Sequence, residues 1–298
     1  MRLITTLILS IFILSGCNLQ SHKDVIVIAY GSSTLAYMST GMNNMVSDLG
    51  AKYISNARGG QIIETLTALQ GSSPILLTFK KCILSSKGMR ASVQLKQENR
   101  IGDLNAKGSF NVVLSNKLKG VLDLDREEFK INNTINVCQN KEKEYVVNFG
   151  YTKYRKNGIH IFNIGKNNIT KGNYSVKQII EAHNTMVEFI KTEGNNKFIV
   201  AGFFVDRGMN EEKKQAVLGV NAALKAKYGL KYFDMQDYLM SAQIWTDLNI
   251  TPTQDDLDKQ ALGELAVSLS RDAKHLSADV DTLIVERLKQ KLQTLGYL

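Results

Sequence analysis

Proline is nearly absent from this chain: two of its 298 residues are proline, against 22 glycines. Pro-rich linkers between independent units are thereby excluded, and no internal repeat or low-complexity tract stands out. With 44% hydrophobic residues, the chain is long enough to bury a sizeable core, as one large domain or two small ones.

Two kinds of functional motif are also missing. No group of His, Cys, Asp and Glu has the spacing of metal ligands, and no Gly-rich phosphate loop is found. The sequence therefore predicts neither a metal nor another cofactor. Among the histidines, His22 lies near the N-terminus, while His160 and His183 fall in apolar segments that favour structural roles.

Cysteine is scarce as well, with three in the chain. Cys17 ends the segment LSGC, which follows a basic start and the apolar run LITTLILSIFIL, too short to span a bilayer comfortably. This order is typical of a bacterial lipoprotein signal peptide over 1–17, the alternative being an ordinary secretory peptide. We expect a lipid on Cys17, a tether over 18–23, and a domain in the periplasm or at the cell surface. Asn18 after Cys17 favours the outer membrane.

The segment 72–155 differs in composition from its surroundings. It carries 15 basic and 8 acidic residues, which is nearly all the positive excess of the chain. Short β-like runs separated by Gly, Asn and charged turns predict a β-rich insertion here. Its charge suits an anionic surface such as lipid headgroups or an acidic glycan, whereas nucleic acid is not expected outside the cytoplasm. Cys82 and Cys138 both lie in it, and either a disulfide or two separate buried thiols fits the sequence.

Outside that segment, apolar runs of strand length alternate with amphipathic helical segments. Such alternation predicts an α/β fold in which helices cover both faces of a parallel sheet. We expect strands within 25–30, 51–57, 158–165, 197–204 and 230–235, and helices within 38–49, 59–69, 175–193, 210–229 and 279–292.

Polar residues follow these strands at the positions where open α/β sheets bind ligands. Taken singly, each has an ordinary explanation as a turn, a helix cap or a loop. Together they predict one site at the carboxyl edge of the sheet. They are Ser32 and Ser33 after the first strand, Gly59 and Gly60 after the second, Asn167 and Asn168 after the third, and Asp272 and His275 before the last helix.

In this order the motifs resemble the conserved blocks of the SGNH hydrolase (GDSL-type esterase) family. VIVIAYGSST resembles the first block, NARGGQ the second, NIGKNN the third and DAKHL the last. The resemblance covers nearly all the chain outside 72–155. It implies a flavodoxin-like three-layer α/β/α sandwich, with 24–71 and 156–298 forming the hydrolase domain.

The resemblance also implies roles for single residues. Ser33 takes the place of the nucleophile, His275 of the general base, and Asp272 of the acid that orients the imidazole. The backbone N–H groups of Ser33 and Gly60 and the amide of Asn167 take the place of oxyanion donors. Glycine is expected at position 60 because a side chain there would block close approach.

Two positions depart from the family pattern. Ser32 and Asn168 stand where the family has acids. Because both keep a short polar side chain, we expect them to hold the turns through hydrogen bonds. Every residue with a direct role is present, so we expect an active enzyme, with an inactive member as the alternative.

These features predict a serine hydrolase that cleaves an ester through an acyl-enzyme. The expected surface location, the absence of an apolar lid segment and the β-rich insertion favour an O-acetylated envelope or extracellular glycan as substrate. A lipase, lysophospholipase or thioesterase is the alternative among enzymes. From another class, a non-catalytic surface lipoprotein that binds a polyanion or a protein partner also fits.

Overall fold

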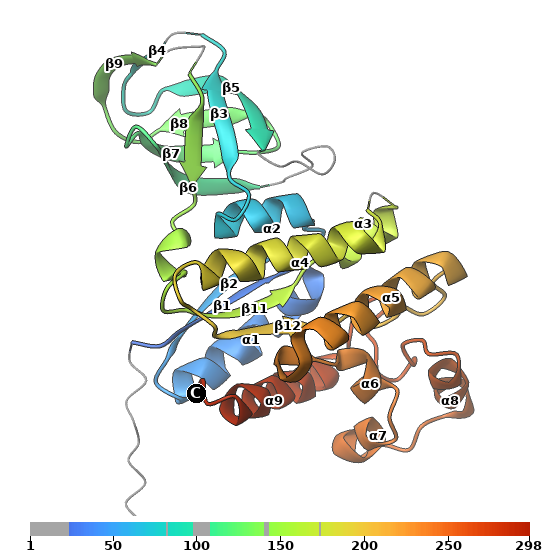
Figure 1. Ribbon diagram of the computed structural model, residues 1–298. Helices are drawn as coiled ribbons and strands as arrows, with labels where there is room; N and C mark the ends of the chain where they lie inside the picture. The colour runs from blue at the N-terminus through green and yellow to red at the C-terminus, as the bar shows by residue number, and fades with distance from the viewer. Residues whose placement is uncertain (1–23, 82, 98–107, 140–142, 173) are drawn as a thin grey trace, which may run out of the picture.

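The computed structural model describes residues 24–81, 83–97, 108–139, 143–172 and 174–298 (Figure 1). Cys17 and Cys82 lie outside these residues, and the side chain of Cys138 is not described, so the lipid anchor and the disulfide stay predictions. Over the described ranges, no helix is long and apolar enough to cross a membrane.

A parallel sheet with the order β13–β12–β11–β1–β2 forms the centre of the molecule. Because β1 pairs with both β11 and β2, it lies inside the sheet, which explains its continuous apolar sequence. Four of these strands fall within the segments predicted from the sequence, and β1 extends one residue beyond its predicted segment, to Gly31. The five strands are β1 (Ile26–Gly31), β2 (Lys52–Ala57), β11 (Ile159–Asn163), β12 (Phe198–Ala201) and β13 (Tyr232–Phe233).

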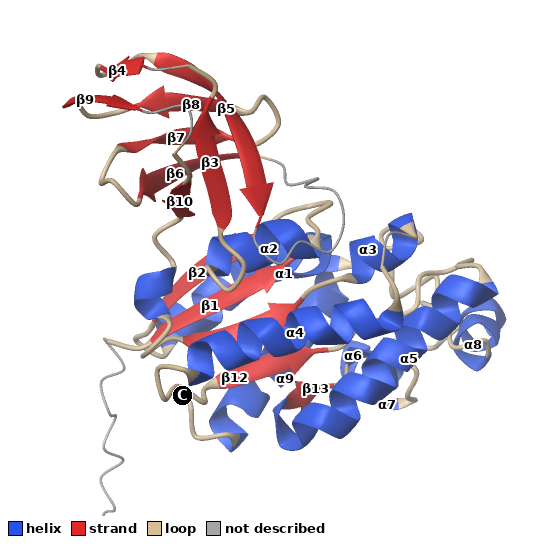
Figure 2. Cartoon of the chain, turned by 45° about the horizontal axis from the view of Figure 1, so that its top comes forward, coloured by secondary structure: helices blue, strands red, loops and turns tan. Residues whose placement is uncertain are grey.

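Helices cover both faces of the sheet, as the alternation predicts (Figures 1 and 2). Two separate hydrophobic clusters form the core, one on each face. The helices α1 (Ser33–Asp48) and α9 (Ala278–Thr294) pack in one cluster, and α2 (Ile63–Gln70), α4 (Val176–Lys191) and α5 (Glu211–Tyr228) in the other.

Several short helices were not predicted, because segments this short show too few turns for a clear apolar period. α3 follows β11 directly, and the other three connect β13 to the loop before α9. They are α3 (Lys166–Lys171), α6 (Met235–Leu239), α7 (Gln243–Leu248) and α8 (Gln254–Ala261); 3₁₀ turns occupy Thr152–Tyr154 and Gly229–Lys231.

Between α2 and β11 the chain forms a closed barrel with the strand order β10–β3–β5–β8–β7–β6. This agrees with the predicted β-rich insertion. The strands are β3 (Ile75–Phe79), β5 (Arg90–Gln97), β6 (Ser109–Leu114), β7 (Lys119–Asp123), β8 (Glu128–Ile131) and β10 (Tyr145–Asn148), with a separate pair of β4 (Ile83–Ser85) and β9 (Ile135–Gln139).

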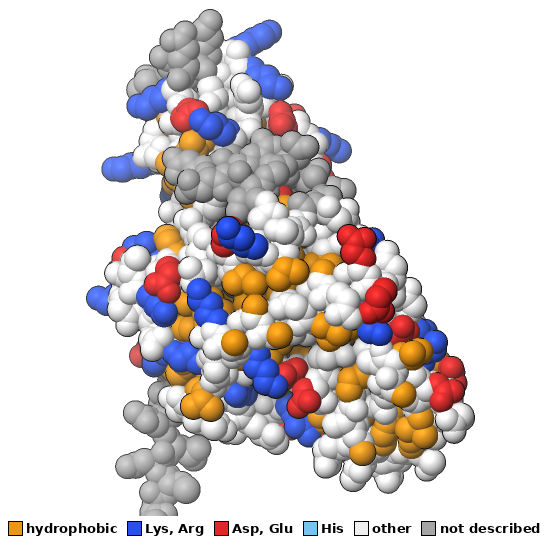
Figure 3. Space-filling view, turned by 45° about the vertical axis from the view of Figure 1, so that its right-hand side comes forward, with side chains coloured by type: hydrophobic (Ala, Val, Ile, Leu, Met, Phe, Trp, Pro, Cys, Tyr) orange, Lys and Arg blue, Asp and Glu red, His pale blue; other side chains and the backbone are white. Residues whose placement is uncertain are grey.

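The barrel packs on the α2 side of the sheet (Figure 2). Leu77 and Phe129 of the barrel belong to the same hydrophobic cluster as Leu66 and Leu69 of α2. The barrel interior and this face of the sheet are therefore one continuous core. Lys and Arg side chains project from the barrel surface, in keeping with the charge of its sequence (Figure 3).

Two histidines are buried in this core. His160 lies in β11 with its ring stacked on Tyr30, and His183 in α4 bonds the carbonyl of Ile179 through Nδ1 at 2.9 Å. Burial lowers the pKa of each imidazole to about 4. Both rings are neutral at pH 7, as expected for structural residues.

The buried histidines predict a loss of stability in mild acid. Their pKa is lower in the folded than in the unfolded chain, so their contribution is complete above about pH 6.5 and is lost as the pH falls towards 4. For His183→Leu, the fall in unfolding free energy between pH 7 and pH 4.5 should be smaller than in the wild type by ~2 kcal/mol. Urea denaturation at the two pH values measures it, and an unchanged fall would contradict the neutral state.

Candidate active site

Ser33 is the first residue of α1, directly after the central strand β1. The helix begins so close to the strand that a Cβ on Gly31 would lie 2.8 Å from Leu35 Cδ1. Glycine is therefore needed at position 31, and its absence of a side chain lets the chain turn sharply into α1. The turn presents the half-buried Ser33 at the carboxyl edge of the sheet.

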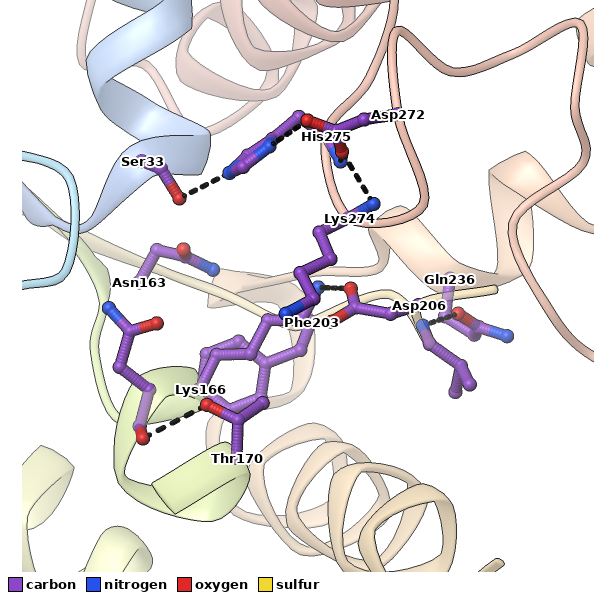
Figure 4. A network of polar contacts seen from close by, with 12 residues as sticks. Ser33, Asn163, Lys166, Thr170, Phe203, Asp206, Gln236, Asp272, Lys274 and His275 are labelled. Atoms are coloured by element: carbon purple, nitrogen blue, oxygen red, sulfur yellow. Dashed lines mark hydrogen bonds and ion pairs between the residues drawn. The ribbon is translucent and has the colours of Figure 1, made fainter. Parts of the chain in front are cut away.

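A chain of hydrogen bonds joins Ser33 to the loop before α9 (Figure 4). Ser33 Oγ lies 3.0 Å from His275 Nε2, and His275 Nδ1 lies 2.8 Å from Asp272 Oδ2. The other oxygen of Asp272 accepts the backbone N–H groups of Lys274 and His275, at 2.7 and 2.9 Å. The structure thus brings together the three residues predicted as nucleophile, base and acid.

These contacts determine the state of Asp272 and of the imidazole. The hydrogen bond from the His275 side chain, followed by that from the Lys274 amide, lowers the pKa of Asp272 to about 2. An ionised Asp272 accepts a hydrogen bond from Nδ1–H, which leaves the lone pair of Nε2 directed at the Ser33 hydroxyl. This is the tautomer that a general base requires.

Side chains that were not identified from the sequence pack against the His275 imidazole. The Tyr37 ring meets His275 edge-on, with 5.0 Å between centroids, and the Arg271 guanidinium stacks on Tyr37 at 4.1 Å. Arg271 in turn pairs with Asp281 of α9 at 2.5 Å. The spacing of Tyr37 one helical turn after Ser33 was the available signal.

The loop after β2 carries Gly60, predicted as an oxyanion donor. Gly60 has φ +75°, but a Cβ there would meet nothing within 4 Å. No protein atom occupies that space, so the expectation that a side chain here would block the approach of a substrate oxygen stays a prediction. Glycine is favoured here because of its left-handed backbone, which residues with a Cβ adopt only with strain.

Asn167 binds this loop from α3. Its Nδ2 donates a hydrogen bond to the carbonyl of Gln61 at 2.8 Å, next to Gly60. A carboxamide nitrogen carries two hydrogens, so one remains for a further acceptor. This hydrogen bond connects α3, which follows β11 and carries Asn167, to the loop after β2, which carries Gly60.

The two positions that depart from the family pattern differ in what they do. Asn168 is fully buried: its Oδ1 accepts the N–H of Ile63 at 3.1 Å, and its Nδ2 donates to Glu64 Oε2 at 3.3 Å. It holds the start of α2, as expected. Ser32 precedes α1, but its side chain makes no capping hydrogen bond, so the expected role is not found there.

Other polar residues at this edge were not identified from the sequence. Asn163, at the end of β11, donates from Nδ2 to the carbonyls of Ala201 and Gly202, both at 3.0 Å. Lys166 and Asp206 form an ion pair at 2.5 Å, and both side chains are about nine-tenths buried. All three residues lie at or shortly after the end of a buried strand, and this position was the available sequence signal.

Within the described residues, no group of His, Cys, Asp and Glu is placed to hold a metal ion.

No known protein family and no curated protein matches the chain. Among solved structures it is similar to a serine-to-alanine mutant of an acetyl esterase with an acetate ion, at 11% identity and a TM-score of 0.44, over 91% of this chain and 97% of that one. It is also similar to a structure named as a GDSL-like lipase from Parabacteroides merdae, at 8% identity and a TM-score of 0.46, over 94% and 99%. Likenesses this low do not decide the function of this chain.

The contacts of Asn168 predict why an acid is absent there. In Asn168→Asp, an oxygen replaces the nitrogen that donates to Glu64, so two carboxylates meet in a buried site. In the unfolded chain this aspartate ionises above about pH 4, whereas in the fold its pKa is higher because Glu64 lies beside it. The unfolded state is therefore increasingly favoured as the pH rises, and the loss of stability grows with pH. We expect a loss of ~1–3 kcal/mol at pH 8 and a smaller one at pH 5, by urea denaturation. An equal loss at both pH values would exclude like-charge repulsion as the cause.

Proposed function

We propose that this protein is a serine ester hydrolase. The proposal depends on one observation above all, the hydrogen-bonded series from Ser33 Oγ through the His275 imidazole to the ionised Asp272. A serine hydroxyl is a weak nucleophile unless a positioned base removes its proton, and here that base lies at 3.0 Å.

The reaction follows from these positions. As Ser33 Oγ attacks the ester carbonyl, its proton passes to His275 Nε2, and Asp272 stabilises the imidazolium. Negative charge develops on the carbonyl oxygen, for which the N–H groups of Ser33 and Gly60 and the free N–H of Asn167 are the proposed donors. His275 then protonates the departing alcohol, and an acyl-enzyme remains on Ser33. A water molecule, deprotonated by His275, then attacks the acyl carbonyl; the bond from this carbon to Ser33 Oγ breaks, His275 returns the proton to Oγ, and the acid leaves.

An O-acetylated glycan is the substrate class we favour. Charged side chains such as Lys213, Asp206 and Lys274 line the cavity beside the His275 loop, together with Met209. Their ammonium and carboxylate groups can bind sugar hydroxyls, which supports a glycan, whereas the long acyl chain of a lipid needs an extended apolar groove. Lipase, lysophospholipase or thioesterase activity would instead show as a preference for long-chain esters over acetyl esters.

We also propose that the protein is a lipoprotein of the bacterial cell envelope, in which 24–71 and 156–298 form the catalytic domain and 72–155 an accessory region. The basic surface of the barrel supports an anionic surface as its neighbour.

Lipid attachment at Cys17 is testable in a bacterial host. Radiolabelled palmitate should enter the wild-type protein, and the label should be lost in Cys17→Ala because no thiol remains to carry the lipid. Cys138→Ala serves as the matched control and should keep its label. A wild-type protein that is cleaved and secreted without label would show an ordinary secretory peptide.

Ser33→Ala tests the reaction. Without the nucleophile, hydrolysis of p-nitrophenyl acetate should fall about 10³-fold or more, and labelling by a fluorophosphonate should disappear. Ser32→Ala is the matched control, since the neighbouring side chain makes no capping bond and should leave the label in place.

The alternative class, a lipoprotein that only binds a polyanion or a protein, predicts a different result. In that case the folded wild-type protein would neither hydrolyse p-nitrophenyl acetate nor react with the fluorophosphonate, and Ser33→Ala would change nothing. That outcome would overturn the proposed hydrolase.

A further inference from the structure

A cavity of about 310 Å³ adjoins the loop that carries His275. It lies where α3, the segment after β12, the start of α5 and the loop before α9 come together. Exposed residues such as Gly208 and Asn210 at its rim connect it to solvent. Its side-chain lining includes Thr170, Asp206, Arg207, Met209, Lys213 and Lys274.

Lys274 connects this cavity to the proposed active site. It stands immediately before His275, and its backbone N–H donates to Asp272 Oδ1 at 2.7 Å. From there its side chain extends away from the Ser33–His275 bond and towards Lys166 (Figure 4). The cavity and the proposed active site therefore share the short loop that carries Lys274 and His275.

The carboxylates around the cavity already have partners. Asp206 is paired with Lys166 at 2.5 Å, and Asp272 with His275 at 2.8 Å. Glu264 accepts the N–H of Gly208 at 2.9 Å. None of the three is paired with a cation that lines the cavity.

The lining cations, in contrast, have neutral partners. Lys213 Nζ donates to the carbonyl of Thr170 at 2.6 Å, and Arg207 Nη1 donates to Ser270 Oγ at 3.1 Å. Among the described residues, Lys274 has no carboxylate within ion-pair distance. Burial lowers the pKa of Lys166, the paired Asp206 carboxylate raises it, and the nearby charge of Lys274 lowers it.

Three cations that line this solvent-connected cavity have no carboxylate partner, and the one lining carboxylate, Asp206, is paired with Lys166, so the cations form a site for a negatively charged group. Resting on the proposed function, we propose that the substrate carries a carboxylate on its alcohol half, as an acylated acidic sugar does, and that Lys213, Lys274 and Arg207 bind this carboxylate. His275 protonates the departing alcohol, so the alcohol half is the part of the ester that lies on the side of the His275 loop.

A matched pair of substrates tests the proposal. Mono-O-acetyl glucuronic acid and mono-O-acetyl glucose differ in the carboxylate, and acetate release from each gives kcat/KM. We expect the wild-type protein to prefer the acidic sugar by about tenfold or more, since a charge-assisted hydrogen bond contributes that much. In Lys213→Gln the ratio of the two kcat/KM values should fall about tenfold, and in Lys274→Gln similarly.

Lys227→Gln is the control. This exposed lysine lies on the same helix as Lys213, about 21 Å further along its axis, and should leave the ratio unchanged. Competition supplies an independent reading: free glucuronate should inhibit hydrolysis of p-nitrophenyl acetate by the wild-type protein more strongly than glucose does.

The outcomes separate the two proposals. If the wild-type protein cleaves p-nitrophenyl acetate but shows no preference for the acidic sugar, or keeps that preference in Lys213→Gln, the carboxylate site is wrong and the hydrolase stands. If p-nitrophenyl acetate is not cleaved and glucuronate does not bind to the protein in calorimetry, both are wrong. Binding without cleavage would support the site and contradict the hydrolase.

Discussion

The packing of α1 against α9 is the constraint on which the site depends. Ser33 begins α1 and His275 precedes α9, so a hydrogen bond between residues 242 positions apart requires these helices to lie in a fixed relation. They meet closely at Gly41, where a Cβ would lie 3.3 Å from Val285 Cγ2. Close-packed interiors transmit even the displacement of one methyl group. Since a shift of about 1 Å at reacting atoms can cost 10²-fold in rate, the apolar contacts of this helix pair are part of the geometry of the proposed active site.

The opposite side of the site is held through polar contacts instead. Asn167 and Asn168 are neighbours in α3, and their amides bind the loop that carries Gly60 and the start of α2, respectively. The same helix α2 contributes Leu66 to the core that it shares with the barrel. The barrel is thus connected to the proposed oxyanion donors through one helix and two amides. The barrel itself supplies none of the residues proposed to react.

Much of this arrangement could be predicted from the sequence, because buried parallel strands and long amphipathic helices have strong periodic signals. β1, β11 and α4 lie where the apolar patterns put them. The motifs at the strand ends likewise identified Ser33, Asp272 and His275, which the structure places in contact. Contacts between residues that are distant in the sequence could not be predicted, such as the pairing of Lys166 with Asp206, 40 residues apart. For glycine at position 60, the φ of +75° is a second reason, which local sequence does not reveal. Short helices such as α6 depend on tertiary packing and cannot be read from local periodicity.

The buried pair of Lys166 and Asp206 connects stability to specificity. Removing two charges from water costs several kcal/mol for each ion, and their attraction only partly offsets that cost, so such a pair adds little to the stability of a fold. The pair matters for ligand binding because Asp206 is occupied by Lys166 and does not pair with the lysines that line the cavity. Held at 2.5 Å by Lys166, whose ammonium also lies 3.6 Å from the centroid of the Phe204 ring, Asp206 forms no ion pair with Lys213 or Lys274. The carboxylate is thereby neutralised from within the protein, and the positive field of the cavity stays available to a ligand. The desolvated ion pair of Lys166 and Asp206 costs stability, but it leaves the cations of the cavity without a carboxylate partner at the place where the alcohol half of an ester would lie.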